Sequence, residues 1–155
     1  MRKNVVLAKV MSLSQTLNDE TKKPVVVDDC CTLIDAEVSE KGGISGLAIK
    51  AGYKVVKGVK PGFVKQVVID LLPEFTAALD PIYDEAKTKE KPVADFFASN
   101  SERVADALLA ITDAKAAKSK SGVVKATYDK LRGTAKKNVE AAVPRLGKMI
   151  EKHAS

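Results

Sequence analysis

Residues 101–118, SERVADALLAITDAKAAK, are the stretch that decides the fold class of this chain. Ser99, Asn100 and Ser101 all suit the N-cap of a helix, because their short side chains accept hydrogen bonds from free backbone N–H groups. Leucine and isoleucine then recur at helical spacing among alanines, with charged residues between them. The stretch predicts a helix from Glu102 to about Lys118.

The rest of the chain carries the same kind of signal. Ser12 is expected to cap a short helix, Pro24 to begin one that stops at Gly42-Gly43, and Pro92 to begin a small one. The helix after Ser12 is expected at 13–17, and further helices are expected at 45–57, 63–79, 123–132 and 134–153, with a short one restarting at Asp80-Pro81. Because no segment alternates with period two, the sequence predicts an all-α fold of about eight helices, at least about two-thirds helical.

Helix 101–118 has a counterpart 78 residues earlier in the chain, which indicates an internal duplication. Further matches follow at smaller offsets, and the pairs include Asp28 and Asp106, Asp35 and Asp113, Lys50 and Lys125, Tyr53 and Tyr128, and Pro73 and Pro144. Each proline lies inside an apolar helical stretch, and Pro73 predicts a kink or a break.

We therefore expect one domain over residues 1–155, built from two tandem four-helix pseudo-repeats. The first covers 12–80, the second covers 92–153, and a charged linker at 81–91 joins them. A helical bundle with pseudo-two-fold symmetry is the favoured arrangement, and a short α-solenoid is the alternative.

Two motif stretches carry a family resemblance. They are GLAIKAGYK at 46–54 with KPGF at 60–63, and ADALLA at 105–110 with TDA at 112–114. In these motifs the chain resembles a family of small uncharacterised bacterial all-helical proteins, over most of its length from Met11 onward. The resemblance implies no activity, because that family has no assigned function.

The N-terminal segment and the two cysteines indicate where in the cell the protein is located. Residues 1–11 are interpreted as an extension before the domain, since Lys9 interrupts an apolar run too short for a signal peptide. No stretch approaches the length of a membrane span. Cys30 and Cys31 are neighbours, and a bond between neighbours is strained, so we expect reduced thiols with at least one facing the core. A cytoplasmic location is expected.

Candidate catalytic residues are few. His153 is the only histidine and lies near the C-terminus, where it is expected to act as a helix-end cation. Asp28, Asp35, Asp106 and Asp113 offer carboxylates for metal or acid–base chemistry, but they lack a histidine or glutamate at matching spacing. We expect them to pair with recurrent Lys50/Lys125 or Tyr53/Tyr128 side chains. No cofactor and no metal site are predicted.

The distribution of charge is the sequence feature that bears on possible binding partners. Segments 41–69 and 115–155 have net charges of +6 and +8, and they flank an acidic middle at 70–114. A Lys-rich face attracts nucleic acid, anionic lipid or an acidic protein. Only four of the 26 basic residues are arginine and aromatic residues are scarce, so sequence-specific nucleic-acid recognition is not expected.

These features lead to three hypotheses of function. The first is a non-enzymatic helical binding or interaction module whose partner is another protein or an anionic surface. The second is polyanion association, with nucleic acid or an anionic membrane surface, through Lys50, Lys54, Lys57, Lys60, Lys125, Lys136 and Lys137. The third is a small-ligand binder or enzyme whose site lies between the pseudo-repeats, around Asp35, Tyr53, Asp113 and Tyr128.

Overall fold

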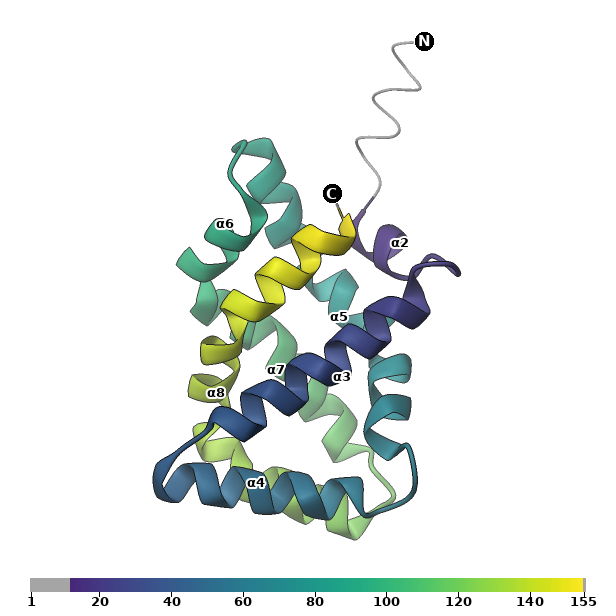
Figure 1. Cartoon of the computed structure of the whole chain (residues 1–155), viewed down its shortest axis with the longest axis vertical. Coiled ribbons are helices and arrows are strands. Elements are labelled where there is room, and N and C mark those ends of the chain that lie inside the picture. Colours follow the sequence, from purple (N-terminus) through teal and green to yellow (C-terminus); the bar gives the residue numbers. More distant parts are fainter. Residues whose placement is uncertain (1–11, 155) are drawn as a thin grey trace.

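The computed structural model describes residues 12–154 and is helical over 85% of them, with no strand in that range (Figure 1). The all-α prediction is confirmed. Seven helices follow one another in the described chain, against about eight expected: α2 (Leu13–Leu17), α3 (Lys23–Glu40), α4 (Gly43–Lys57), α5 (Phe63–Thr88), α6 (Val93–Ser99), α7 (Ser101–Ala117) and α8 (Gly122–Ala154). The extension expected at residues 1–11 lies outside the described residues.

The short first helix has the cap that the sequence indicates. The Ser12 side chain accepts a hydrogen bond from the backbone of Gln15, whose own side chain accepts one from the backbone of Ser12. The carboxylate of Asp80 also accepts hydrogen bonds from the backbone and the hydroxyl of Ser14, at 3.1 and 2.7 Å. This second contact fixes α2 to α5.

Most of the segment predicted as a linker, 81–91, is helical, because α5 continues to Thr88 through both Pro73 and Pro81. Each proline removes one backbone donor, but the helix buries apolar side chains on both sides of these positions, from Val68 to Ala86. Packing on the core therefore outweighs two lost hydrogen bonds. The chain leaves the helix only at Lys89–Pro92, where Glu90 has a positive φ of 55°.

The break expected before Thr134 is also absent, since α8 is one helix of 33 residues. Gly133 lies inside it, and a glycine within a helix costs only about 1 kcal/mol relative to alanine. In Figure 1 the helix changes direction in its green-to-yellow stretch, which contains Pro144. Pro144 therefore does not end this helix.

The hydrophobic core is formed by every described helix except α4. Its largest fully buried side chains are aliphatic apart from Phe97 and Thr76, and they include Leu13, Val26, Val104, Val143 and Ile150. The first described helix, α2, contacts the last, α8, so the helices close into a bundle. The end-to-end stacking of the solenoid alternative does not have this contact. No described helix is both long and apolar enough to cross a membrane.

Candidate functional site

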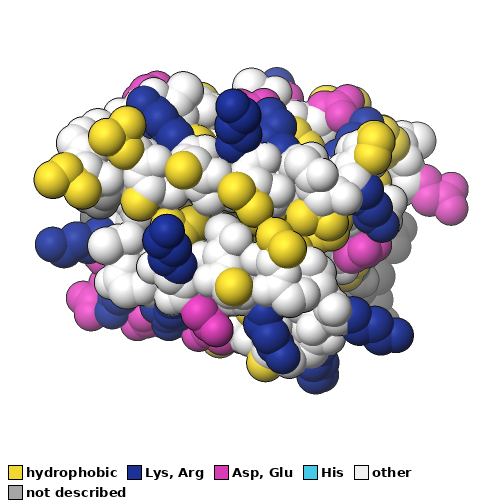
Figure 2. Space-filling model, turned by 90° about the horizontal axis from the view of Figure 1, so that it is seen from below, with side chains coloured by type: hydrophobic (Ala, Val, Ile, Leu, Met, Phe, Trp, Pro, Cys, Tyr) yellow, Lys and Arg dark blue, Asp and Glu magenta, His cyan; other side chains and the backbone are white. Residues whose placement is uncertain are grey.

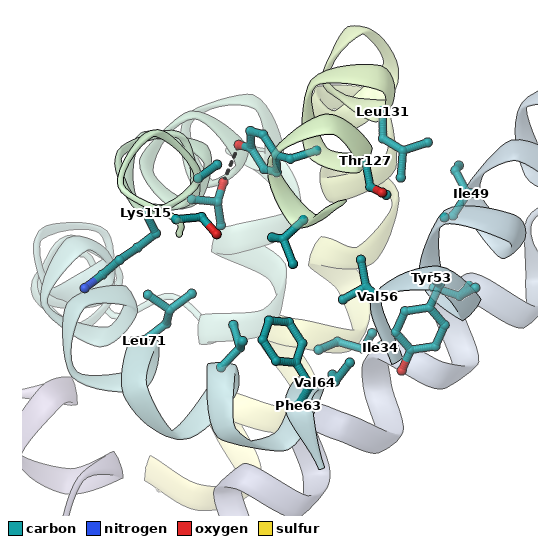
Figure 3. Close-up of a pocket in the computed structure, with 18 of the residues that line it drawn as sticks. Ile34, Ile49, Tyr53, Val56, Phe63, Val64, Leu71, Lys115, Thr127 and Leu131 are labelled. Carbon is teal, nitrogen blue, oxygen red and sulfur yellow. Dashed lines mark hydrogen bonds between the residues drawn. The ribbon is translucent and has the colours of Figure 1, made fainter. Parts of the chain in front are cut away.

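An apolar cavity of about 610 Å³ lies beside α4, the helix at the lower end of Figure 1. Side chains of α3, α4, α5, α7 and α8 line it. Figure 3 shows Ile34, Val56, Phe63 and Val64 around it on one side and Leu131 and Thr127 on the other. The cavity therefore lies between the first and second halves of the chain.

Helix α4 forms one wall of the cavity because its inward positions recur every three or four residues. Ile49, Tyr53 and Val56 lie on this face. Between them, Gly52 brings α4 close to α8, since a Cβ at this position would lie 2.8 Å from Cδ1 of Leu131. A glycine at this position therefore allows the two helices to pack closely.

The opposite wall carries a hydrogen-bonded hydroxyl pair. The hydroxyl oxygens of Thr112 and Tyr128 lie 2.8 Å apart, as the dashed line in Figure 3 shows. Tyr128 also donates a hydrogen bond to Asp113, which accepts two more from Arg132, at 2.8 and 3.1 Å. Arg132, followed by Tyr128, lowers the pKa of Asp113, whereas burial and the neighbouring carboxylate raise the pKa of Tyr128.

A second tyrosine–aspartate pair lies on the α3–α4 side, where the ring of Tyr53 lines the cavity. Tyr53 donates a hydrogen bond to Asp35 at 2.5 Å, and the hydroxyl of Tyr53 points outward in Figure 3. Burial of the ring and then the hydrogen bond to Asp35 raise the pKa of Tyr53. Lys57 lies 3.9 Å from the same carboxylate.

The four residues predicted as one polar cluster therefore form two separate Tyr–Asp pairs. Both tyrosines line the cavity, but neither Asp35 nor Asp113 does. The reason is geometric: each aspartate lies one residue after a lining position, Ile34 or Thr112, and so points about 100° away around its helix. The tyrosines, not Lys50 and Lys125, are the partners of these carboxylates.

A second cavity of about 300 Å³ adjoins the first. Ile34, Val38 and Ile49 line both cavities, so the two lie side by side. The lining of the second cavity is almost entirely apolar, with Cys30, Phe75 and Met149 among its members. The first cavity lies beside α4, and the second is lined by core residues such as Leu72 and Ile150.

The other two predicted carboxylates form ion pairs on the surface. Asp28 pairs with Lys65 at 3.4 Å, and Asp106 pairs with Lys136 at 3.2 Å. In the described part of the chain, no group of three histidine, cysteine or acidic side chains is arranged to hold a metal ion. The recurrence of aspartate along the chain is therefore accounted for by pairing.

The lysines predicted for polyanion binding divide into two sets. In the first set, Lys57 forms an ion pair with Asp35, and Lys136 forms ion pairs with Glu102 and Asp106. Lys60 lies over the ring of Phe63. The others are exposed and form no ion pair within the described residues: Lys50, Lys54, Lys125 and Lys137. The exposed set is shared between α4 and the first half of α8.

The cysteines are free thiols, and both pack against the core. Burial, with smaller contributions from Cys31 and Asp29, raises the pKa of Cys30 to about 12. The thiol of Cys30 lies 3.8 Å from the sulfur of Met149. These are the surroundings of a packing residue and not of a reactive nucleophile.

Two features of the structure were not predicted from the sequence. Phe63, Val64 and Val67 form a wall of the cavity, yet in the sequence they are ordinary apolar positions at the start of a helix. His153, expected only to act as a helix-end cation, is buried and lies 2.6 Å from Asp29. Only the tertiary packing of α3 against α8 shows this contact.

Comparison with known proteins gives one positive result. Residues 13–154 match the model of a family of unknown function, DUF6918. The chain belongs to this family. The match covers nearly all of the described chain and agrees with the resemblance to an uncharacterised family, and it assigns no activity. No curated protein and no solved structure matches the sequence.

Proposed function

We propose that this member of the DUF6918 family is a non-enzymatic helical binding module that holds an apolar small molecule in the cavity between its two halves. The observation that carries the proposal is the cavity of about 610 Å³, whose lining is mostly aliphatic and aromatic. Ligand sites of proteins commonly have volumes of about 300–1,000 Å³ and combine an apolar lining with a few placed polar groups.

The chemistry of the walls indicates the kind of ligand. Apolar side chains such as Val56, Phe63 and Leu131 would take hydrocarbon surface out of water, which is the main favourable contribution to binding an apolar molecule. The Thr112–Tyr128 pair offers one hydroxyl group that can orient a polar end of the ligand. Because the second cavity adjoins the first, a long and narrow molecule fits this interior better than a compact one.

The proposal includes the internal duplication, which the lining of the cavity supports. At the offsets of 78 and 75 residues seen in the sequence, matched residues from both halves line the cavity: Ile34 and Thr112, Val38 and Ala116, Ile49 and Val124, Gly52 and Thr127, Tyr53 and Tyr128, and Val56 and Leu131. A cavity built from paired positions is what two packed copies of one unit would enclose.

We also place the protein in the cytoplasm, since both of its cysteines are free thiols and a reducing compartment keeps them so. The carboxylates of Asp35 and Asp113, beside lining positions of the cavity, accept hydrogen bonds from Tyr53, Tyr128 and Arg132, and Asp70, which lines the cavity, accepts one from Gln66. These bonds hold the walls in place and favour a binding role over acid–base catalysis.

Binding can be tested with cis-parinaric acid, a polyene fatty acid that fluoresces more strongly in apolar surroundings. We expect saturable binding by the full chain. The variant Val64→Phe fills part of the cavity and should weaken binding about tenfold, which corresponds to about 1.4 kcal/mol. Val25→Phe is the matched control, because Val25 is a half-exposed valine outside the cavity.

Two outcomes would count against the proposal. One is the absence of saturable binding by the wild-type protein. The other is equal loss of binding in Val64→Phe and Val25→Phe, which would place the probe on the surface. Native mass spectrometry of protein purified without denaturant gives an independent readout, since a retained apolar molecule would add a defined mass.

A further inference from the structure

The outward face of α4 carries an apolar stripe that no other described element covers. Ile44, Leu47 and Val55 are 88%, 69% and 48% exposed, and Ala48 and Ala51 between them are exposed as well. Their spacing places all five on one side of the helix. Among the described helices, α4 alone has no fully buried apolar side chain.

Lysines lie beside this stripe. Lys50 and Lys54 follow Leu47 by three and seven residues, so they occupy the adjoining edge of the helix, and both are exposed. Segment 41–69 contains six lysines and no acidic residue. Figure 2, which views the molecule from the α4 end, shows apolar side chains spread across this face with lysines among them.

We propose that α4 is an interfacial helix through which the protein docks on a bilayer surface with anionic headgroups. An amphipathic helix with lysines beside an aliphatic face binds at this boundary, since its apolar side chains enter the acyl region while its cations remain near the headgroups. Lysine charge alone would also attract nucleic acid. Contacts with phosphates would, however, leave the apolar side chains of Ile44 and Leu47 exposed to water. The combination of stripe and charge therefore favours lipid.

The two faces of α4 then have different roles. The inward face, with Ile49 and Val56, forms a wall of the cavity, and the outward face meets the bilayer. Docking in this way would bring the cavity wall to the membrane surface. The docking inference rests on the outward face and stands whether or not the cavity holds a ligand.

Flotation of the full chain with lipid vesicles tests the inference. Vesicles of phosphatidylcholine with about one-third phosphatidylglycerol should carry the protein at about 50 mM salt, and much less at about 200 mM. Pure phosphatidylcholine vesicles should carry little. Leu47→Glu should reduce binding about tenfold or more, whereas Val25→Glu, on an exposed valine of α3, should leave it unchanged.

A charge-matched pair of variants separates docking from general attraction. Lys50→Glu with Lys54→Glu should abolish most of the binding, while Lys91→Glu with Lys148→Glu changes the net charge equally at exposed sites outside α4 and should leave most of it. Circular dichroism of each variant checks that the fold is retained.

Any of four results would overturn the inference: no flotation with anionic vesicles at the lower salt, wild-type binding by Leu47→Glu, equal losses in the two lysine pairs, or tighter binding of a random-sequence DNA duplex than of vesicles. Sedimentation equilibrium adds one more. A wild-type dimer that becomes a monomer in Leu47→Glu would show that a second copy of the chain covers this face.

Discussion

Nε2 of His153, at the end of α8, lies 2.6 Å from Oδ2 of Asp29 in the middle of α3. Lys152 lies 3.0 Å from the same oxygen, and Nζ of Lys22 donates a hydrogen bond to the carbonyl of His153. The C-terminal end of the chain is therefore fastened to the first half by polar contacts, one of which is sheltered because His153 is buried.

Because of this contact, the free energy of unfolding should depend on pH in the acidic range. The hydrogen bond to His153, followed by that to Lys152, lowers the pKa of Asp29 below its ordinary value of 3.8. A carboxylate with a lowered pKa stabilises the fold above its unfolded pKa, and this contribution is lost as the pH falls through the folded pKa. In urea unfolding experiments, we expect the free energy of unfolding of the wild type to fall below about pH 4. The free energy of unfolding of His153→Ala should fall less over that range.

At neutral pH, His153→Ala should lower the free energy of unfolding by about 1–3 kcal/mol, because it removes a buried side chain and a hydrogen bond to a charged group. Lys152→Ala should cost less, since the Lys152 side chain is 65% exposed. An equal cost for the two variants would contradict the role assigned to burial of His153.

At Gly147, α8 packs closely against α6. A Cβ added at this position would lie 2.9 Å from Cα of Ala94, which is backbone and cannot move aside cheaply. Gly147→Ala should therefore lower the free energy of unfolding by about 1–3 kcal/mol.

Gly133→Ala is the matched control for Gly147, because Gly133 lies in the same helix and a Cβ added there would meet nothing within 4 Å. This variant should raise stability by about 0.5–1 kcal/mol, since alanine favours the helix. Thermal unfolding followed by circular dichroism measures both. Stabilisation by Gly147→Ala would show that α6 and α8 do not pack this closely.

The adjacent cysteines should react at different rates. The nucleophile is the thiolate, and burial raises the pKa of Cys30 to about 12, so little thiolate forms at pH values near 8. Burial also raises the pKa of Cys31, which is the less enclosed of the two.

Single-cysteine variants separate the two thiols in a reaction with dithionitrobenzoate. Cys31→Ser, which leaves Cys30, should react more slowly than Cys30→Ser, and both should react more slowly than free cysteine. Fast reaction of Cys30 in the folded protein would mean that its helix face opens to solvent.

The sequence predicted the helical class because its signals are local. Ser12 and Pro24 stand where caps and first turns need them, and these residues act within one turn of their own position. The continuity of α5 and α8 could not be predicted this way. Pro73, Pro81 and Gly133 weaken a helix locally, and only the burial of side chains on both sides of them keeps each helix whole.

In the candidate site too, local features were predictable from the sequence, and features set by tertiary packing were not. Pairing of recurrent aspartates with Tyr53 and Tyr128 was foreseeable from the repeated spacing, and the structure contains both hydrogen bonds. The cavity was not foreseeable as a volume, because Phe63 and Val64 resemble core residues in sequence and line a hollow only through the relative position of α4, α5 and α8. Cavity volume depends on packing between elements far apart in the chain.

The two Tyr–Asp pairs give a test of the internal duplication. Tyr53→Phe and Tyr128→Phe each remove a hydroxyl that donates to a carboxylate, and both should lower the free energy of unfolding, by about 0.5–1.5 kcal/mol. Tyr83→Phe is the control, because its hydroxyl makes only a 3.4 Å contact with the carbonyl of Ala154 and should matter less. A cost at one pair and none at the other would mean that the two positions are not equivalent.

Alkaline titration supplies a second readout that stability alone does not give. In Tyr83→Phe, the two remaining tyrosines, Tyr53 and Tyr128, should both ionise above the ordinary pKa of 10.0, because burial and then the adjacent aspartate disfavour the tyrosinate. A raised folded pKa stabilises the fold below the unfolded pKa, and this contribution is lost as the pH rises through the folded value. Absorbance of tyrosinate against pH should therefore show that both tyrosines ionise later than free tyrosine, whereas an early transition from either one would show that its aspartate partner is absent in solution.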